Sequence, residues 1–158
     1  ISIICYMIAI TRFNDTTYRE NREWCKKNGY QGTIYGSPMR ISEKISPDAE
    51  LYVLEMNNST NRIMGIGYIM PGRNTIKRAK IYRDNNYNRF IYNSSRRIDL
   101  ENDYVSIKLI KLIISLEKAL FYGSRHCKRG QGIQLLPHWI RLSPVDLIRE
   151  LIKKYFNK

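Results

Sequence analysis

The chain has 158 residues, of which 27 are Lys or Arg and 14 are Asp or Glu, so its formal net charge is +13. This length predicts a single domain over residues 1–158 and argues against a two-domain enzyme with a separate cofactor domain. The hydrophobic share of 43% supports a packed core. No run approaches the ~20 apolar residues of a membrane-spanning helix, so we expect no membrane partner.

The cysteine pattern gives no sign of a metal or disulfide framework. Cys5, Cys25 and Cys127 are odd in number and widely spaced, and no pair has the spacing of a zinc or redox motif. We therefore expect an intracellular, reducing location, no metal and no cofactor. The abundance of Ile, Asn, Lys and Tyr is typical of a protein from an AT-rich genome.

The first part of the chain predicts a strand, a helix and a short extended segment. The apolar, β-branched run Ser2–Ile10 predicts a central strand. Thr17-x-x-Glu20 can form a capping box that opens a helix, and Asn28-Gly29 can end that helix in a left-handed turn. The segment Gly32–Gly36 is too short for a helix, and its glycines allow close approach to another part of the molecule.

A hairpin is expected next. Leu51–Met56 and Arg62–Met70 read as strands, and the turn-rich linker between them predicts that they pair antiparallel. Gly65 and Gly67 thin one face of the second strand. Such thinning lets a strand bend at a barrel corner, or lets another backbone come close.

The second part of the chain predicts short strands and two further helices. Ser106–Tyr122 is the clearest helix, because its apolar residues recur at helical spacing and cover a wide face. A final helix is expected from Ser143-Pro144, which suit the first helical positions. The expected short strands are Lys80–Tyr82, Arg89–Tyr92, Arg96–Leu100 and Trp139–Leu142. The predicted fold class is α+β, with a small antiparallel β-barrel or curved sheet and about three packed helices.

Basic residues gather in two stretches of the chain, over 73–97 and 125–129. Aromatic residues such as Tyr87 and Phe90 are interleaved with the first stretch. Basic side chains neutralise phosphates and rings stack on bases, so this mixture is typical of surfaces that bind single-stranded nucleic acid. A solvated basic face and an acidic protein partner are the alternatives. The residues expected to hold the phosphate path are Arg78, Arg83, Arg89, Arg96, Arg97, Arg125, His126, Lys128 and Arg129.

The segment Gly123–Gly132 combines glycines at both ends with three fixed positive charges and a histidine. Exposed backbone N–H groups and basic side chains are the groups that clamp a phosphate backbone. The alternative is a helix C-terminal cap, in which basic side chains offset the negative end of the helix dipole. Lys128 and Arg129 lie too far along the chain for that role, so we favour a binding loop.

Catalytic motifs are scarce. The sequence has no P-loop, no nucleophile elbow and no HExxH motif. Asp99 and Glu101 would share a face of a strand, which leaves a metal-dependent nuclease as an alternative. Solvated or Arg-paired carboxylates are the simpler interpretation, and we expect the protein not to be an enzyme.

The order of pieces from Ile4 to Met70 resembles the PUA-like superfamily, especially its EVE and YTH branches. Cys5–Thr11 matches the first strand of that family, Gly32–Ser37 its Gly-aromatic segment, and Arg62–Ile69 its Gly-rich strand. In YTH proteins the Gly-aromatic segment carries a Trp of the cage that encloses N6-methyladenine, and Tyr35 occupies the matching place. The base pocket implied by the resemblance consists of Thr11, Tyr35, Gly36, Ser37 and Asn58, and we add Trp139 as a further aromatic wall that no motif assigns.

The remainder of the chain looks like a protein group of large DNA viruses that infect eukaryotes, which implies the host cytoplasm or a virus factory as the location. Taken together, the sequence predicts a PUA-like module that binds RNA. It would stack a single-stranded or flipped nucleotide near Tyr35, with the reading of a modified base as one option. The alternative is a basic structural or assembly protein that docks on an acidic partner or on packaged nucleic acid. The expected partners are therefore nucleic acid, RNA above all, or a protein in a viral complex.

Overall fold

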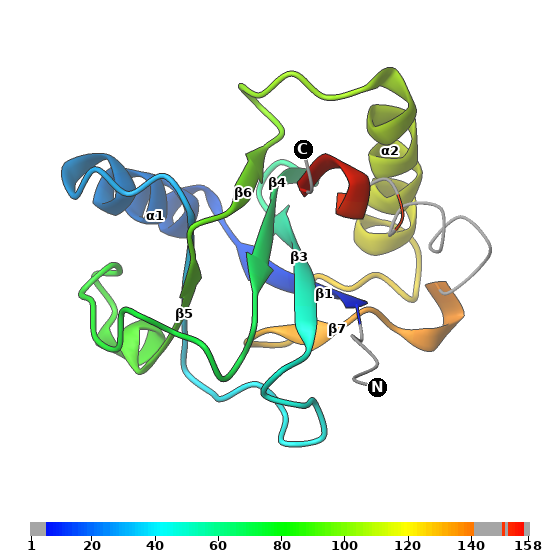
Figure 1. The fold of residues 1–158 in the computed structure, drawn as a ribbon. Helices are drawn as coiled ribbons and strands as arrows, with labels where there is room; N and C mark the ends of the chain where they lie inside the picture. The colour runs from blue at the N-terminus through cyan, green and yellow to red at the C-terminus, as the bar shows by residue number, and fades with distance from the viewer. Residues whose placement is uncertain (1–5, 141–149, 151, 157–158) are drawn as a thin grey trace, which may run out of the picture.

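The computed structural model describes residues 6–140, 150 and 152–156. A five-stranded sheet in the order β6-β4-β3-β1-β7 forms its centre, and a two-stranded ribbon of β2 and β5 lies beside it (Figure 1). The strands are β1 (Tyr6–Phe13), β2 (Thr33–Ser37), β3 (Glu50–Asn57), β4 (Arg62–Ile69), β5 (Phe90–Ser94), β6 (Arg97–Asp99) and β7 (Gln134–Leu135). The helices are α1 (Asp15–Lys27) and α2 (Ile107–Phe121), with 3₁₀ turns η1 (Asn85–Asn88) and η2 (His138–Ile140). Residues 150 and 152–156 near the C-terminus are also helical, in keeping with the expectation of about three helices.

The α+β class is confirmed, but the sheet is mixed rather than antiparallel. β1 pairs in parallel with β3, with Met7 opposite Leu51, whereas β3 and β4 form the expected antiparallel hairpin. A parallel pair needs a long connection, and here α1 and β2 lie within the segment that joins β1 to β3. The described strands form an open sheet with β6 and β7 at its edges, and they do not close into a barrel.

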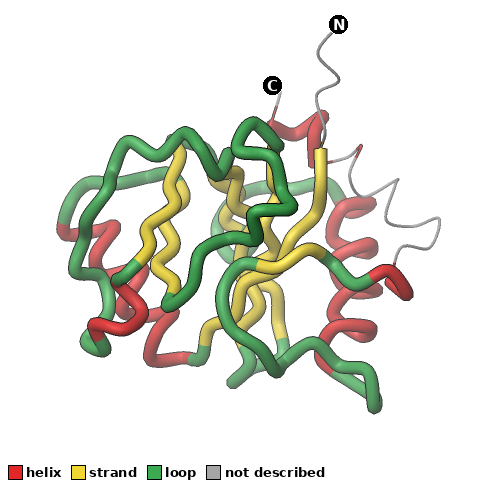
Figure 2. The backbone as a smooth tube through the Cα atoms, turned by 90° about the horizontal axis from the view of Figure 1, so that it is seen from below, coloured by secondary structure: helices red, strands yellow, loops and turns green. Residues whose placement is uncertain are grey.

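Elements cover both faces of the sheet (Figure 2). α2 lies on one side, and the β2–β5 ribbon and α1 lie on the other. Strand alternation supplies both layers: Ile8 and Ile10 of β1 join the core under α2, while Ala9 joins the core under the ribbon. The result is a layered fold with two apolar cores on either side of one sheet.

Helix α1 begins earlier than the sequence pattern predicts. Asn14 is its N-cap, and the Asn14 Oδ1 accepts the Thr17 N–H at 2.8 Å, so the capping box joins Asn14 and Thr17 rather than Thr17 and Glu20. β1 extends to Phe13, past the predicted end at Ile10. The predicted helix end is confirmed, because Asn28 is the C-cap and Gly29 has a φ of 61°.

Two predicted strands are absent from the described residues. In the segment 80–82 the Asn88 side chain takes the place of a neighbouring strand, because its Oδ1 accepts the N–H groups of Ile81 and Tyr82 at 3.0 and 2.9 Å. The chain at 138–140 forms η2 instead of a strand. Residues 141–142 and the predicted helix start at Ser143-Pro144 lie outside the described residues.

Candidate functional site

Tyr35 belongs to the protein interior, contrary to the prediction that it walls a base pocket. Its side chain is 2% exposed, and its hydroxyl donates a hydrogen bond to Glu55 Oε2 at 2.7 Å. Burial, and then the Glu55 carboxylate, raises the pKa of Tyr35 well above its ordinary value. A ring enclosed in this way has no free face on which a base could stack.

Arg97 is likewise occupied. Its Nη2 and Nε donate to Glu55 Oε1 and Oε2 at 2.6 and 3.0 Å, and only 3% of its side chain is exposed. Burial by itself lowers the pKa of Arg97, but the Glu55 carboxylate raises it by more, so Arg97 stays charged. The prediction that Arg97 contacts phosphate is therefore wrong: Arg97 neutralises a buried carboxylate.

Gly65 and Gly67 make room for this buried network. A Cβ at Gly67 would overlap the Tyr35 hydroxyl, and a Cβ at Gly65 would lie 2.5 Å from Arg97 Nη2. The glycine pattern thus indicates a close approach, as predicted, but the approaching groups are side chains rather than a backbone.

A polar pocket of about 350 Å³ opens at the end of β1, and we call it the Arg12 pocket. It brings together three residues of the predicted base pocket and one of the predicted phosphate contacts, namely Thr11, Gly36, Asn58 and Lys128. The other lining residues are Arg12, Phe13, Asn14, Thr17, Pro38, Tyr82, Tyr87, Gly130, Gln131 and Gly132. Among these described lining residues there is no Asp or Glu.

Arg12 gives the pocket its main charge. Its Nε donates to the Cys127 carbonyl at 2.6 Å and its Nη1 to Gln134 Oε1 at 3.0 Å. Within the described part of the chain it has no carboxylate partner. Burial lowers the pKa of Arg12, as expected for a guanidinium that is partly removed from water without an anion beside it.

The loop at 127–132 is held over Arg12 by two local features. Gly130 has a φ of 108°, and a Cβ there would lie 3.2 Å from the Arg12 guanidinium, so only glycine lets the loop backbone lie so close. The Asn58 Nδ2 donates to the Lys128 carbonyl at 2.9 Å. The Asn58 Oδ1 is buried and has no partner among the described residues. Asn58 therefore positions the loop.

Sequence reasoning missed Arg12. It lies between Thr11 and Phe13, both buried, in a strand that is otherwise almost entirely apolar. A lone arginine in such a strand is the signal that could have identified it, because a buried charge needs a partner.

Two further predicted pocket residues lie elsewhere. Ser37 is buried, and its hydroxyl donates to the Met39 carbonyl at 2.7 Å within a turn. Trp139 belongs to η2, where the Arg125 guanidinium lies 6.0 Å from its ring centroid. Neither residue lines the Arg12 pocket, so the predicted set is only partly brought together.

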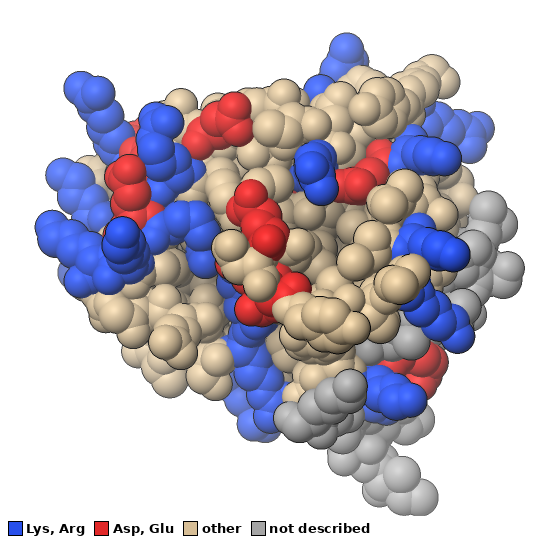
Figure 3. Space-filling view, turned by 90° about the horizontal axis from the view of Figure 1, so that it is seen from above, with Lys and Arg blue, Asp and Glu red and all other residues tan. Residues whose placement is uncertain are grey.

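Most of the predicted phosphate contacts lie on the surface. Arg78, Arg83, Arg89, Arg96, Arg125 and Arg129 are exposed, whereas His126 and Lys128 are half-buried. The His126 Nδ1 accepts the Lys128 N–H at 3.2 Å, so that ring serves the loop itself. On the face in Figure 3, Lys and Arg lie toward both edges with acidic side chains beside and between them. This face therefore carries no single basic patch.

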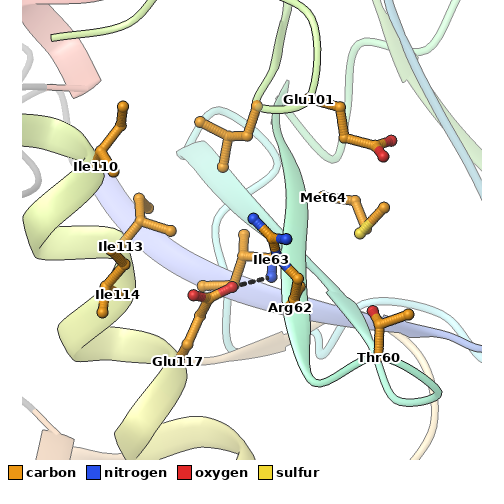
Figure 4. Close-up of a pocket in the computed structure, with 10 residues that line it drawn as sticks. Thr60, Arg62, Ile63, Met64, Glu101, Ile110, Ile113, Ile114 and Glu117 are labelled. Atoms are coloured by element: carbon orange, nitrogen blue, oxygen red, sulfur yellow. Dashed lines mark hydrogen bonds between the residues drawn. The ribbon is translucent and has the colours of Figure 1, made fainter. Parts of the chain in front are cut away.

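A larger cavity of about 460 Å³ lies between α2 and β4. Side chains of both elements face each other across it, including Ile113 of α2 and Ile63 of β4 (Figure 4). Glu101 and Glu117 also line it, and Glu117 Oε2 accepts the Ile63 N–H at 2.7 Å. Arg62 is the one basic residue of the described lining, so two glutamates outweigh it and the cavity disfavours a polyanion. The Arg12 pocket is therefore the better anion site.

Asp99 and Glu101, the carboxylates considered for a metal site, do not lie side by side on a strand. Asp99 ends β6 and its Oδ1 accepts the Glu101 N–H at 2.9 Å, so the two residues share a turn and not a strand face, contrary to prediction. No three His, Cys, Asp or Glu side chains within the described ranges could hold a metal ion together. Cys25 and Cys127 are free thiols, and burial raises the pKa of both, which makes them poor nucleophiles.

Comparison of the chain with protein-family models, with curated proteins and with solved structures found no match. In the part of the chain that the structure describes, none of the helices has the length and apolar character needed to cross a lipid bilayer.

Proposed function

We propose that the protein binds single-stranded nucleic acid, RNA in the first instance, and holds one nucleotide in the Arg12 pocket. The observation that carries this proposal is the Arg12 guanidinium, which is half-buried beside Lys128 with no carboxylate partner among the described residues. A partly desolvated cation attracts an anion strongly, and arginine matches the geometry of a phosphate.

The rest of the lining suits a nucleotide. Tyr87 supplies a half-buried aromatic ring, and Gln131 supplies an exposed amide that can hydrogen bond to a base edge. Gly130 and Gly132 bring backbone close to the ligand space. The pocket therefore offers a ring and an amide to the base and a guanidinium to the phosphate.

Kinship with the PUA-like superfamily is part of the same proposal. It is supported by the order of the first elements: a strand whose end opens on a pocket, then a helix, then a hairpin with a Gly-rich second strand. Because Tyr35 is buried, selectivity for a methylated base has no support from Tyr35. Among the described aromatic residues that line the pocket, Phe13 and Tyr82 are buried and Tyr87 is half-buried, so we assign the aromatic wall to Tyr87.

The proposal is tested by fluorescence anisotropy with a labelled single-stranded RNA of mixed sequence and with the matching duplex. We expect the single strand to bind more tightly, and Arg12→Ala to weaken its binding by about tenfold, the effect of losing a charge-assisted contact. Lys118→Ala removes an exposed charge of α2 that does not line the pocket, and it is the control. An affinity for single strands that Arg12→Ala and Lys128→Ala both leave unchanged would contradict the proposal.

A second candidate function is assembly with another copy of the chain through α2. One face of α2 carries three exposed isoleucines beside the cavity between α2 and β4 (Figure 4). They are Ile107, Ile110 and Ile114, which are 71%, 41% and 47% exposed. Exposed apolar side chains gathered in this way mark an interaction surface. Two antiparallel α2 helices would place Lys108 of one copy near Glu117 of the other, which suits a two-fold pairing.

Sedimentation of the purified, nuclease-treated protein tests the second candidate. We expect a dimer that Ile110→Asp converts to a monomer. A monomer at every concentration would reject this role without affecting the nucleic-acid proposal.

A further inference from the structure

A groove of about 430 Å³ adjoins the Arg12 pocket, and we call it the Met39 groove. Both cavities are lined by Gln131 and Gly132, so one short stretch of backbone separates them. Gln131 is exposed, which leaves the top of this dividing wall open to solvent.

Gly132 forms part of the dividing wall. It has a φ of 77°, and a Cβ there would lie 3.1 Å from Ser37 Oγ and 3.3 Å from Met39 Cγ. A side chain at this position would therefore be strained and would press on Ser37 and Met39. As glycine, it lets a ligand chain pass from one cavity to the other with only backbone beneath it.

The Met39 groove combines an apolar floor with two cations. Ile45 and Ile133 form part of the floor, and Met39 is 49% exposed beside them. Arg40 and Lys44 line the same groove and are exposed. The described residues provide neither of them with a carboxylate partner, and the described lining contains no acidic residue.

This composition matches a nucleotide rather than a protein segment. A base presents a flat face that packs on apolar side chains, and methionine adapts readily to such shapes. The adjacent phosphate needs cations, which Arg40 and Lys44 supply. An acidic peptide that lacks aromatic residues would satisfy the two cations but would leave the apolar floor without a ring to pack on it.

We propose that the ligand is a single-stranded oligonucleotide that crosses Gly132 and places a second base on the Met39 groove, with a phosphate held by Arg40 and Lys44. This inference rests on the proposed function and extends it from one nucleotide to a chain. Because the bases lie in separate cavities on either side of a backbone wall, they must be unpaired, and a duplex does not fit.

The test compares ribonucleoside monophosphates with a labelled RNA oligonucleotide on the wild type and two double variants. Arg40→Ala/Lys44→Ala should weaken oligonucleotide binding by about tenfold or more and leave any monophosphate affinity unchanged. The salt dependence of log K should also become shallower by about 0.7, because the double variant loses one phosphate contact and each such contact on a single strand contributes about 0.7. Lys111→Ala/Lys118→Ala removes the same charge from α2 and should change neither affinity by a comparable amount.

Apolar contact is tested separately by Met39→Ala, which should weaken the oligonucleotide without changing the salt slope. If Arg40→Ala/Lys44→Ala and Met39→Ala both bind the oligonucleotide as the wild type does, the second subsite is overturned and the Arg12 pocket stands. If the wild type binds no single strand at all, the proposed function itself fails. An acidic peptide that binds as tightly as the RNA and loses the same affinity in the double variant would overturn the nucleic-acid assignment of the groove.

Discussion

Arg97 and Glu55 form a bidentate ion pair that joins β6 to β3 inside the protein, with N–O distances of 2.6 and 3.0 Å. The Tyr35 hydroxyl adds a third donor from β2. A buried carboxylate is tolerated only when its acceptors are satisfied, and here three donors from two separate elements satisfy it. The network therefore fixes the position of the β2–β5 ribbon on the central sheet.

Glu55→Ala tests this arrangement, since it leaves the buried Arg97 charge without its two short hydrogen bonds and with the Asp99 Oδ2, 3.8 Å from Nη1, as its remaining carboxylate among the described residues. We expect the free energy of unfolding to fall by about 3–5 kcal/mol, as measured by urea denaturation. The matched control is Asp48→Ala, which breaks an ion pair to Arg73 at 3.9 Å between side chains that are 67% and 80% exposed. Its cost should stay below about 1 kcal/mol. Equal losses of unfolding free energy in the two variants would show that the buried pair does not hold the β2–β5 ribbon on the central sheet.

Tyr35→Phe separates the structural role of Tyr35 from the pocket role that the sequence predicted. The change removes one hydrogen bond to a charged acceptor and should lower the free energy of unfolding by about 1.5–3 kcal/mol. RNA affinity, measured by anisotropy on the folded variant, should be unchanged, because the ring lies in the core. A loss of base discrimination in this variant would restore the original prediction.

Gly67→Ala places a methyl group against the Tyr35 hydroxyl. Overpacking of this kind costs about 1–3 kcal/mol, which urea denaturation would detect. In a double-mutant cycle, Tyr35→Phe should relieve part of the clash, so the double variant should lose less stability than the sum of the two single changes by more than about 0.5 kcal/mol. If the two losses of stability simply add, the alanine methyl group does not press on the Tyr35 hydroxyl in the folded variant.

The sequence predicted those elements that local patterns determine. The β3–β4 hairpin follows from its turn residues, the end of α1 follows from Asn28-Gly29, and α2 follows from apolar periodicity. The parallel pairing of β1 with β3 was not predicted, because a strand pattern states neither partner nor direction. The burial of Arg97 was not predicted for a similar reason: its partner Glu55 lies 42 residues away.

The candidate site was predicted in part for a geometric reason. Side chains on a strand alternate between two faces, so Tyr35 and Gly36 of β2 must point in opposite directions. Gly36 lines the Arg12 pocket, and Tyr35 therefore faces the sheet. The resemblance pointed to a segment that does line the Arg12 pocket through Gly36, but it could not show which of two neighbouring residues faces that pocket.

The lowered pKa of Asp99 makes the free energy of unfolding depend on pH in the acid range. Burial raises its pKa, but hydrogen bonds from Asn102 and Glu101 and the charge of Arg97 lower it by more, so the pKa lies below its ordinary value of 3.8. A depressed pKa contributes stability that is present above the unfolded-state pKa and is lost as the pH falls through the folded-state pKa. Asp99→Asn should therefore be less stable than the wild type near neutral pH, and the difference should shrink below about pH 4. Urea denaturation across this range measures it, and a difference that is independent of pH would contradict the assignment.

The sequence predicts the same role, a phosphate contact, for the neighbours Lys128 and Arg129, but the structure places only Lys128 in the pocket lining. Lys128 lines the Arg12 pocket, whereas Arg129 is exposed and does not line it. Lys128→Ala should weaken single-stranded RNA of any sequence by about tenfold and reduce the salt slope by about 0.7, which corresponds to one lost phosphate contact. Arg129→Ala removes the same charge one residue further on and should have a clearly smaller effect on both quantities. Anisotropy titrations at several salt concentrations distinguish the two variants. Equal losses would indicate a general attraction of a basic loop for RNA, and the pocket would then not be the place where the phosphate binds.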